Sequence, residues 1–272
     1  MASVAQSALT YLILNIPSNP LILLIEGCST MALYNMSLFY SKPADPLNAP
    51  FARTRWFFRY QTAMIVLTAL ALSLLLYSVF HLGFYSMLYL GFVGIASMLY
   101  NLPFLRLGKS KGGLRQIPGL KLFHIAIVWS LSTVGLPIVD AWEHGLPIDW
   151  HAANFLGAIK VLFLLICTLP FDVRDFRQDS YYNLKTIPTM IGTQRSIRLN
   201  YLMIGMHSLL IAFAPYGLAI KVGLWISNIF IVCVLRKFIF LPQQNHYHAA
   251  YLLDLALVAQ FVAVLMMIYI MC

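Results

Sequence analysis

The sequence predicts an all-α integral membrane protein with eight or nine transmembrane helices. Hydrophobic residues make up 61% of its 272 residues and charged residues 10%, and the mean hydropathy is +0.79. Apolar runs of about 20 residues recur along the chain, and each is long enough to cross the hydrocarbon layer as a helix. The sequence has no segments of about ten residues with the polar–apolar alternation of a membrane β-barrel strand.

The expected spans follow from these runs. Lipid offers the backbone no hydrogen-bond partner, so each run is expected to be helical. A short first helix within residues 3–19 is interrupted by Pro17 and Pro20. The longer spans are expected at residues 20–40, 58–81, 83–101, 121–141, 152–170, 198–217, 218–236 and 248–271. The chain shows neither an internal repeat nor a low-complexity segment, so residues 1–272 are expected to form a single polytopic membrane domain.

The basic residues are distributed unevenly between the two ends of the predicted bundle. The net charge is +9, and 16 of the 18 Lys and Arg residues fall on one face if the span from residue 20 ends near Tyr40. The opposite face carries the acidic segment 140–150, which has no Lys or Arg. By the positive-inside tendency, the basic face is expected to be cytoplasmic, in the inner membrane of a bacterium. The charge therefore reflects topology, and no nucleic-acid partner is expected.

Three long connections share the basic face, which suggests a site that opens there. They are residues 41–57, 102–120 and 171–197.

The third connection contains the stretch FDVRDFRQDSYYNLKTIPTMIG, residues 171–192. Asp172, Asp175 and Asp179 are spaced by three and then four residues, so a helix continuing from the preceding span would place them on one face. Mg²⁺ would relieve their repulsion, because it is commonly held by one or two carboxylates together with phosphate oxygens. The alternative is a solvated acidic helix end that Arg174 and Arg177 neutralise.

This stretch closely resembles the second aspartate motif of UbiA-type membrane prenyltransferases. That motif is D-x-x-D-x-x-x-D, followed by a small residue, a basic residue, Thr, x, Pro and a Gly four residues beyond. The matching positions are Asp172, Asp175, Asp179, Lys185, Thr186, Pro188 and Gly192. Asn183 stands where the family often has Gly, and both residues tolerate a left-handed backbone. The resemblance implies a UbiA-like bundle around a central cavity, with Mg²⁺ held by the three aspartates and the diphosphate contacted by Lys185.

The middle connection, YNLPFLRLGKSKGGLRQIPGLK at residues 100–121, is similar to the family's Tyr-x-x-x-Lys/Arg segment. The resemblance implies substrate-binding roles for Tyr100, Arg106 and Lys121, the last two as diphosphate contacts. A guanidinium fork suits phosphate oxygens, and a lysine adds a point charge. The alternative is the ordinary basic charge of a cytoplasmic loop.

The first connection departs from the family pattern, which is N-D-x-x-D-x-x-x-D followed by Asn-x-Pro. An alignment anchored on Asn35 puts Met36, Phe39 and Pro43 at the aspartate positions. An alignment anchored on DPLNAP retains one carboxylate, Asp45. Asn35 is therefore expected to contact the substrate, and Asp45 to be the remaining metal ligand. Removing one preorganised stabiliser of a developing charge typically costs about 2.7–4 kcal/mol, so this loss weakens the case for catalysis.

Ionisable residues within the predicted spans are candidates for function, because their burial in lipid is expensive. Glu26 is expected either to line the base of a cavity or to pair with a buried partner such as Lys160. Asp254 is expected to pair across the bundle. His124 and His207 are expected to be core histidines with satisfied hydrogen bonds.

The functional hypothesis is Mg²⁺-assisted transfer of a prenyl group from a polyprenyl diphosphate to a lipophilic acceptor. The resemblance implies acceptors of the quinone-precursor or tetrapyrrole type. The alternative is a non-catalytic UbiA-like membrane protein that binds an isoprenoid lipid or a partner enzyme. A transporter using Glu26, Lys160 and Asp254 is a third hypothesis, although no matched pair of interrupted helices supports it. The Asp-Gly and Ala-Arg elements of a CDP-alcohol phosphotransferase are missing from residues 172–192.

Overall fold

The computed structural model describes residues 1–40, 42–49, 52–99, 105–107, 110–112, 119–176, 185–240 and 251–271. The first half comprises α1 (Ala2–Leu14), α2 (Pro20–Tyr40), α3 (Ala52–Arg59), α4 (Gln61–Phe80), α5 (Phe84–Leu99), β1 (Leu105–Leu107) and β2 (Ser110–Gly112). The second half comprises α6 (Leu120–Ser130), the π-helical turn η2 (Leu131–Gly135), α7 (Leu136–Glu143), α8 (Trp150–Arg174), α10 (Ile187–Ile191), α11 (Thr193–Phe213), α12 (Leu218–Val234), the π-helical turn η3 (Leu235–Ile239) and α13 (Tyr251–Met271).

The helices match the predicted spans. Among the described residues, seven helices are long and apolar enough to cross a membrane, judged by length and composition, and α1 and α5 are shorter apolar helices. The prediction of an all-α membrane bundle is therefore confirmed. The only strands described, β1 and β2, form a short antiparallel hairpin in which Arg106 lies opposite Lys111. The helix α3 was not predicted.

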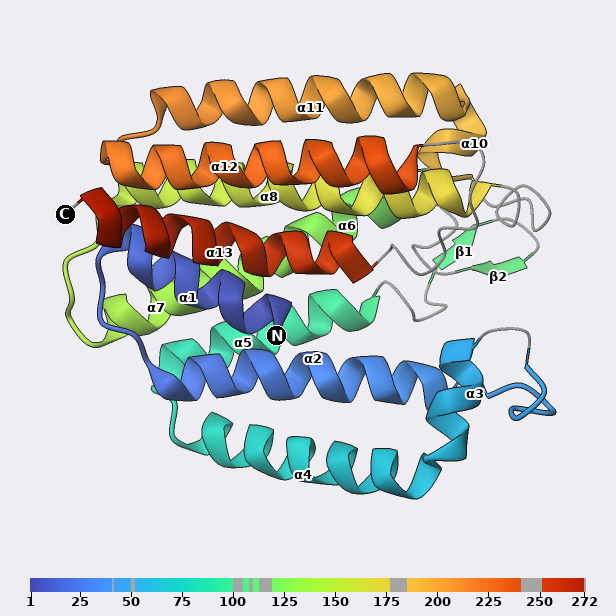
Figure 1. Cartoon of the computed structure of the whole chain (residues 1–272). Coiled ribbons are helices and arrows are strands. Elements are labelled where there is room, and N and C mark those ends of the chain that lie inside the picture. The colour runs from blue at the N-terminus through green and yellow to red at the C-terminus, as the bar shows by residue number, and fades with distance from the viewer. Residues whose placement is uncertain are drawn as a thin grey trace.

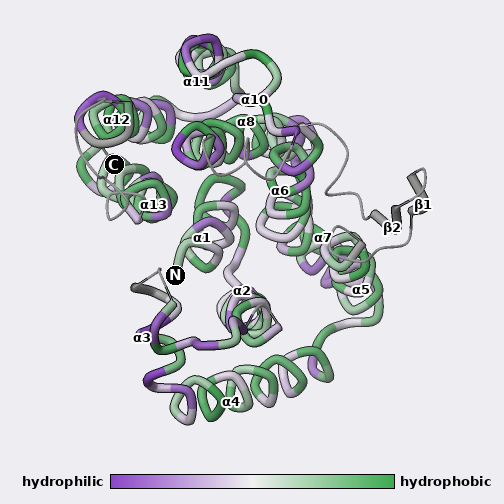
Figure 2. Tube along the Cα trace, turned by 90° about the vertical axis from the view of Figure 1, so that its right-hand side faces the viewer, coloured by the Kyte–Doolittle hydropathy of each residue, from purple (hydrophilic) through white to green (hydrophobic). Residues whose placement is uncertain are grey.

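The long helices run along a common direction, and the ends of α2, α5 and α8 that precede the long connections lie at the same end of the bundle (Figure 1). The other end has short turns, apart from the segment between α7 and α8. Viewed along the bundle, α1 lies inside the arrangement formed by the other helices (Figure 2). It packs against α2, α7, α8, η2 and α13. Its 13 residues end at Leu14, and the left-handed backbone of the C-cap Asn15 (φ 51°) turns the chain before Pro17 and Pro20.

Two of the three carboxylates of the acidic segment, Glu143 and Asp149, bond to the first turns of helices. Asp149 is the N-cap of α8, and its side chain accepts hydrogen bonds from two backbone N–H groups of the first turn, each at 3.0 Å. The Glu143 carboxylate accepts from the backbone N–H groups of Tyr85 and Ser86 at the start of α5, at 3.0 and 2.9 Å. A helix N-terminus favours negative charge because its first N–H groups lack partners within the helix. The acidity of this end therefore has a structural cause.

A polar network joins α1, α8 and α13 in the bundle core. Lys160 is 1% exposed, and its ammonium donates to the backbone and side-chain oxygens of Gln6, both at 2.6 Å. The Gln6 amide in turn donates to the side-chain oxygen of Gln260 at 3.2 Å. Glu26 is also buried, but its carboxylate accepts from Ser132 at 2.5 Å. Lys160 and Glu26 thus have different hydrogen-bond partners and interact only at longer electrostatic range.

The π-helical turn η2 receives polar groups from three other helices. The hydroxyl of Thr10 in α1 donates to the carbonyl of Thr133 at 2.7 Å, and Tyr89 in α5 donates to that of Leu131 at 3.1 Å. Glu26 in α2 accepts from Ser132, as described above. A π-helical turn shifts the hydrogen-bond register of a helix, and here side chains from neighbouring helices bond to the shifted segment.

Each of the two predicted core histidines has one hydrogen-bonded ring nitrogen, while the buried Nε2 of His207 has no hydrogen-bond partner among the described residues. His124 contacts the carbonyl of Ala96 at 2.9 Å, and His207 contacts the side-chain oxygen of Asn228 at 2.8 Å. Asp254 lies exposed in the first turn of α13, where the helix N-terminus favours a negative charge.

Candidate functional site

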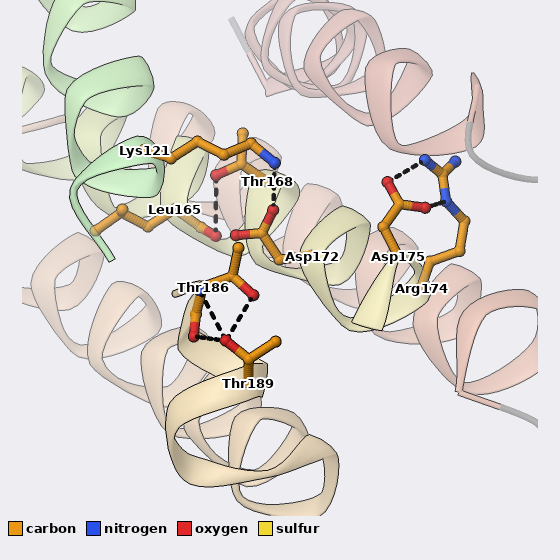
Figure 3. A network of polar contacts seen from close by, with 8 residues as sticks. All are labelled: Lys121, Leu165, Thr168, Asp172, Arg174, Asp175, Thr186 and Thr189. Atoms are coloured by element: carbon orange, nitrogen blue, oxygen red, sulfur yellow. Dashed lines mark hydrogen bonds and ion pairs between the residues drawn. The ribbon is translucent and has the colours of Figure 1, made fainter. Parts of the chain in front are cut away.

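The candidate site lies where α8 ends beside the start of α6, at the end of the bundle that carries the long loops. Asp172, in the last turn of α8, is 3% exposed. Its Oδ1 lies 2.6 Å from the ammonium nitrogen of Lys121, in the first turn of α6 (Figure 3). A carboxylate this deeply buried needs a nearby positive charge to remain ionised. Two residues 51 positions apart, both predicted to bind the substrate or its metal, are therefore direct partners.

Asp175 is held by its sequence neighbour. The guanidinium of Arg174 donates from Nε to Oδ1 at 2.7 Å and from a terminal nitrogen to Oδ2 at 2.8 Å, forming a bidentate pair. Figure 3 shows this pair pointing away from the Lys121–Asp172 pair. α8 ends at Arg174 and Asp175 is its C-cap, so α8 itself does not extend over all three aspartates, and their alignment on one face stays a prediction. Asp179 lies outside the described residues.

The Thr-x-Pro-x-x-x-Gly part of the motif starts and ends a short helix. Thr186 is the N-cap of α10 and forms a capping box with Thr189, whose hydroxyl accepts from the Thr186 backbone N–H at 2.8 Å (Figure 3). Pro188 lies in the first turn of α10. The backbone N–H groups of a first turn have no acceptor within the helix, so the N–H that proline lacks is not missed there. Gly192 connects α10 to α11 with a φ of 86°, which a residue with a side chain adopts only with strain. These three motif positions thus have a folding role.

A backbone hydrogen bond ties the middle and third connections together. The N–H of Gly119, the N-cap of α6, donates to the carbonyl of Lys185 at 2.9 Å. This tie places the start of α10 next to the start of α6, while the side chain of Lys185 is exposed. Lys185 and Lys121 therefore enter the same end of the bundle from two loops. The sequence motif gave no sign of this tie.

Asn35 and Asp45, the two residues that the family resemblance assigned to the site near the first connection, have local hydrogen-bond partners. The side-chain amide of Asn35 in α2 donates to the hydroxyl of Thr68 in α4 at 2.9 Å. Asp45 is exposed, and its carboxylate accepts from the side-chain and backbone nitrogens of Asn48 at 2.8 and 3.3 Å. These hydrogen bonds hold the pKa of Asp45 below its usual value. Both contacts stabilise local structure, and the proposed roles of Asn35 and Asp45 stay predictions.

The remaining predicted residues are described incompletely. Tyr100 lies outside the described residues. Arg106 belongs to β1, for which the structure gives the backbone position. Their predicted substrate contacts are not tested.

Two described carboxylates at the end of α8 provide hard oxygen donors, the type that Mg²⁺ prefers. Among the described residues, no group of three or more His, Cys, Asp or Glu side chains could together hold a metal ion. A site built on Asp172 and Asp175 would take its other ligands from water and from a phosphate-bearing substrate, which is common for Mg²⁺. The donor chemistry fits Mg²⁺, although each carboxylate has an internal cation with which the metal would compete.

The fold resembles that of a solved membrane protein. No protein-family model and no curated protein sequence matches the chain. A structure of a UbiA homolog from Archaeoglobus fulgidus, bound to GPP and Mg²⁺, aligns over 97% of this chain and 88% of its own, with a TM-score of 0.50 and 12% identity. A structure of a UbiA homolog from the same organism bound to DMAPP and Mg²⁺ aligns over the same shares, with a TM-score of 0.48 and 12% identity.

The bundle and the first of these likenesses define the class of protein: a polytopic helical membrane protein. Its particular fold is UbiA-like, as the sequence motif predicted.

Proposed function

We propose that this protein transfers a prenyl group from a polyprenyl diphosphate to a lipophilic acceptor, with Mg²⁺ as cofactor. One observation carries the proposal: the buried Asp172–Lys121 pair lies at the loop end of a UbiA-like bundle, three residues before a second carboxylate, Asp175. The structural neighbour with that fold was solved with GPP and Mg²⁺. The acceptor type, a quinone precursor or a tetrapyrrole, rests on the family resemblance.

In this proposal, Asp172, Asp175 and Asp179 hold the metal, and Asp45 is the remaining candidate ligand from the first connection. The metal, when bound, stabilises the negative charge that develops on the diphosphate. Lys121, Lys185 and Arg106 contact the diphosphate, whereas Asn35 and Tyr100 contact the remainder of the substrate. The bond between the allylic carbon and the diphosphate oxygen breaks, its electron pair leaves with the diphosphate, and the acceptor bonds to the freed carbon and loses a proton.

The Lys121–Asp172 pair has a specific part in this scheme. In the substrate-free protein, Lys121 supplies the positive charge that the buried carboxylate requires. With Asp172 as a metal ligand, the ammonium of Lys121 would be available to contact the diphosphate. One lysine thus serves both states, so the site keeps its carboxylate ionised without a bound metal.

The alternative function is binding of an isoprenoid lipid or a partner enzyme without catalysis. The observation that favours it is the loss of carboxylates in the first connection, where Asn35 and Asp45 have structural partners of their own. Turnover of any allylic diphosphate by the purified protein would exclude this alternative.

The test is binding of a thio-analogue of geranyl or farnesyl diphosphate to the purified protein in detergent, with and without Mg²⁺. We expect Mg²⁺-dependent binding that collapses in Asp172→Asn. Asp149→Asn is the matched control, because it removes a carboxylate at the opposite end and keeps an N-cap residue. Binding that does not depend on Mg²⁺, or that survives Asp172→Asn, would contradict the proposal.

The proposed topology is a single domain in a bacterial inner membrane with the site facing the cytoplasm. The basic charge of the loop end supports it. Labelling of single cysteines placed at the exposed positions 185 and 144 with a membrane-impermeant reagent tests it. Only position 144 is expected to react from the periplasmic side.

A further inference from the structure

The helix α3 differs from the other helices in direction and composition. It joins α2 to α4 at the loop end and runs across the ends of both helices (Figure 1). Its sequence, ARTRWFFR, is amphipathic and has three arginines in eight residues. Figure 2 shows hydrophilic residues on α3, while α4 beside it is largely hydrophobic. A short helix of this kind, lying across the ends of spanning helices, is expected at the plane where the hydrocarbon meets the headgroups.

The inner face of α3 is fixed by aromatic packing. Phe57 and Phe58 are 2% and 7% exposed. Their rings lie 4.9 and 6.4 Å from the ring of Phe39 in α2, in edge-to-face geometry. Aromatic pairs of this kind add to the stabilisation from apolar burial. The orientation of α3 about its own axis is therefore set by α2, and so is the identity of the residues that face outward.

Two exposed amphipathic rings lie on α3 and at the junction that follows it, where Tyr60 is the N-cap of α4. Trp56 and Tyr60 are 56% and 50% exposed, and their rings lie 5.7 Å apart. In the second turn of α4, Ile65 and Val66 are 48% and 59% exposed, so the following helix also presents apolar side chains to its surroundings. Trp and Tyr gather at the level of the lipid headgroups, where one part of the ring is apolar and the other is wet. Two exposed rings of this kind at the end of the bundle are typical of the boundary of a bilayer.

The helix α3 and the segment before it also carry exposed positive charge. Arg55 and Arg59, one helical turn apart, are exposed, and so is Lys42, whose ammonium lies 5.6 Å from the centre of the Phe58 ring. Arg55 also donates to the carbonyl of Ala49 at 2.6 Å, which braces the loop before the helix. Within residues 42–60 the sequence has one carboxylate, Asp45.

We propose that α3 is an interfacial helix that binds the headgroup phosphate of an anionic phospholipid through Arg55 and Arg59. In this arrangement, Trp56 and Tyr60 lie against the upper part of the acyl chains. The exposed rings and the adjoining apolar surface of α4 favour a lipid over a free diphosphate, because a water-soluble anion would gain nothing from them. The site is independent of prenyl transfer, since α3 contributes no residue to the Asp172–Lys121 pair.

Native mass spectrometry of the purified full chain in detergent tests the proposal, with dioctanoyl phosphatidylglycerol and dioctanoyl phosphatidylcholine as probes. We expect the wild type to prefer the anionic lipid. Each cationic side chain near an anionic headgroup contributes about 1 kcal/mol, so Arg59→Gln should reduce the preference about five-fold. Arg198→Gln is the matched control, because Arg198 is exposed at the start of α11, far from α3 in both views. That variant should retain the preference.

Three results would overturn the proposal: no preference in the wild type, an equal loss in both variants, or displacement of the lipid by inorganic diphosphate. The last result would assign the arginines to a soluble anion. A second measurement does not depend on either arginine variant. Lipids brominated near the headgroup should quench the fluorescence of the wild type more than that of Trp56→Phe. Equal quenching would show that Trp56 does not lie at the interface.

Discussion

Replacing Lys121 by methionine should destabilise the protein by leaving the buried Asp172 carboxylate without its cation. Breaking a fully buried ion pair in this way typically costs about 3–5 kcal/mol. The side chain of Asp172 is 4% exposed, but that of Lys121 is 36% exposed. Solvent screening at the lysine therefore reduces the expected loss to about 2–3 kcal/mol. At roughly 2–4 °C per kcal/mol, the apparent Tm should fall by about 5–10 °C.

A double-mutant cycle measures whether this loss belongs to the pair. Asp172→Asn removes the buried charge, so in the Lys121→Met background it should restore part of the lost stability. We expect a coupling free energy of about 1–3 kcal/mol from the thermal unfolding of the four proteins in one detergent. Lys185→Met, at an exposed position of the same loop end, should change stability by no more than about 0.5 kcal/mol. Additive effects at Lys121 and Asp172 would refute the reasoning, because independent sites show no coupling.

The same variant also tests the proposed metal site. Lys121→Met removes the ammonium that competes for the Asp172 carboxylate, so added Mg²⁺ should raise the Tm of this variant more than that of the wild type. If Mg²⁺ stabilises neither protein while the coupling is present, the pair is structural and the metal proposal fails.

Three further predictions concern packing, capping and pH. Gly223→Ala should cost about 1–3 kcal/mol, because its Cβ would lie 2.5 Å from the Cα of Val264, and thermal unfolding would measure the loss. Thr186→Ala should expose α10 to proteolysis by removing an N-cap worth about 1 kcal/mol, whereas Thr186→Ser should not. The pKa of Asp45 is held below its usual value, so its turn should be intact above pH 3.8 and open only as the pH falls through the lowered pKa. Amide exchange at Asn48 reports this opening. The dependence of the exchange on pH should be absent in Asp45→Asn, because that side chain does not titrate.

The membrane helices could be predicted because length and composition determine them. A run of about 20 apolar residues in lipid has few alternatives to a helix, so the predicted spans match the observed helices to within a few residues. The helix α3 was missed because its apolar residues are adjacent, at 56–58, and are flanked by arginines. This pattern is typical of a charged loop. The segment becomes a helix through tertiary packing of Phe57 and Phe58 against α2.

The candidate site could be predicted only in part. The motif identified Asp172, but no spacing rule connects it with Lys121, because the pair depends on how α6 packs against α8. The aspartate spacing suggested one helical face, whereas α8 ends before Asp175. Conversely, Thr186 and Pro188 matched a family motif for a reason that is local, since together they start a helix. A motif in a single sequence does not separate residues that react from residues that shape the chain.

The π-helical turn in the middle of the α6–α7 span has a consequence for how the helices are aligned along the membrane normal. Apolar helices in lipid slide past one another at little cost, because one leucine replaces another and no hydrophobic force opposes the shift. The hydroxyls of Thr10 and Tyr89 and the carboxylate of Glu26 each meet this turn at a fixed height. A shift of one residue, about 1.5 Å along a helix, would break such a bond where no water can replace it. The bonds to this turn thus fix the positions of α1, α2 and α5 along the membrane normal. Because α3 follows α2, they also fix the height of α3 relative to the bilayer surface.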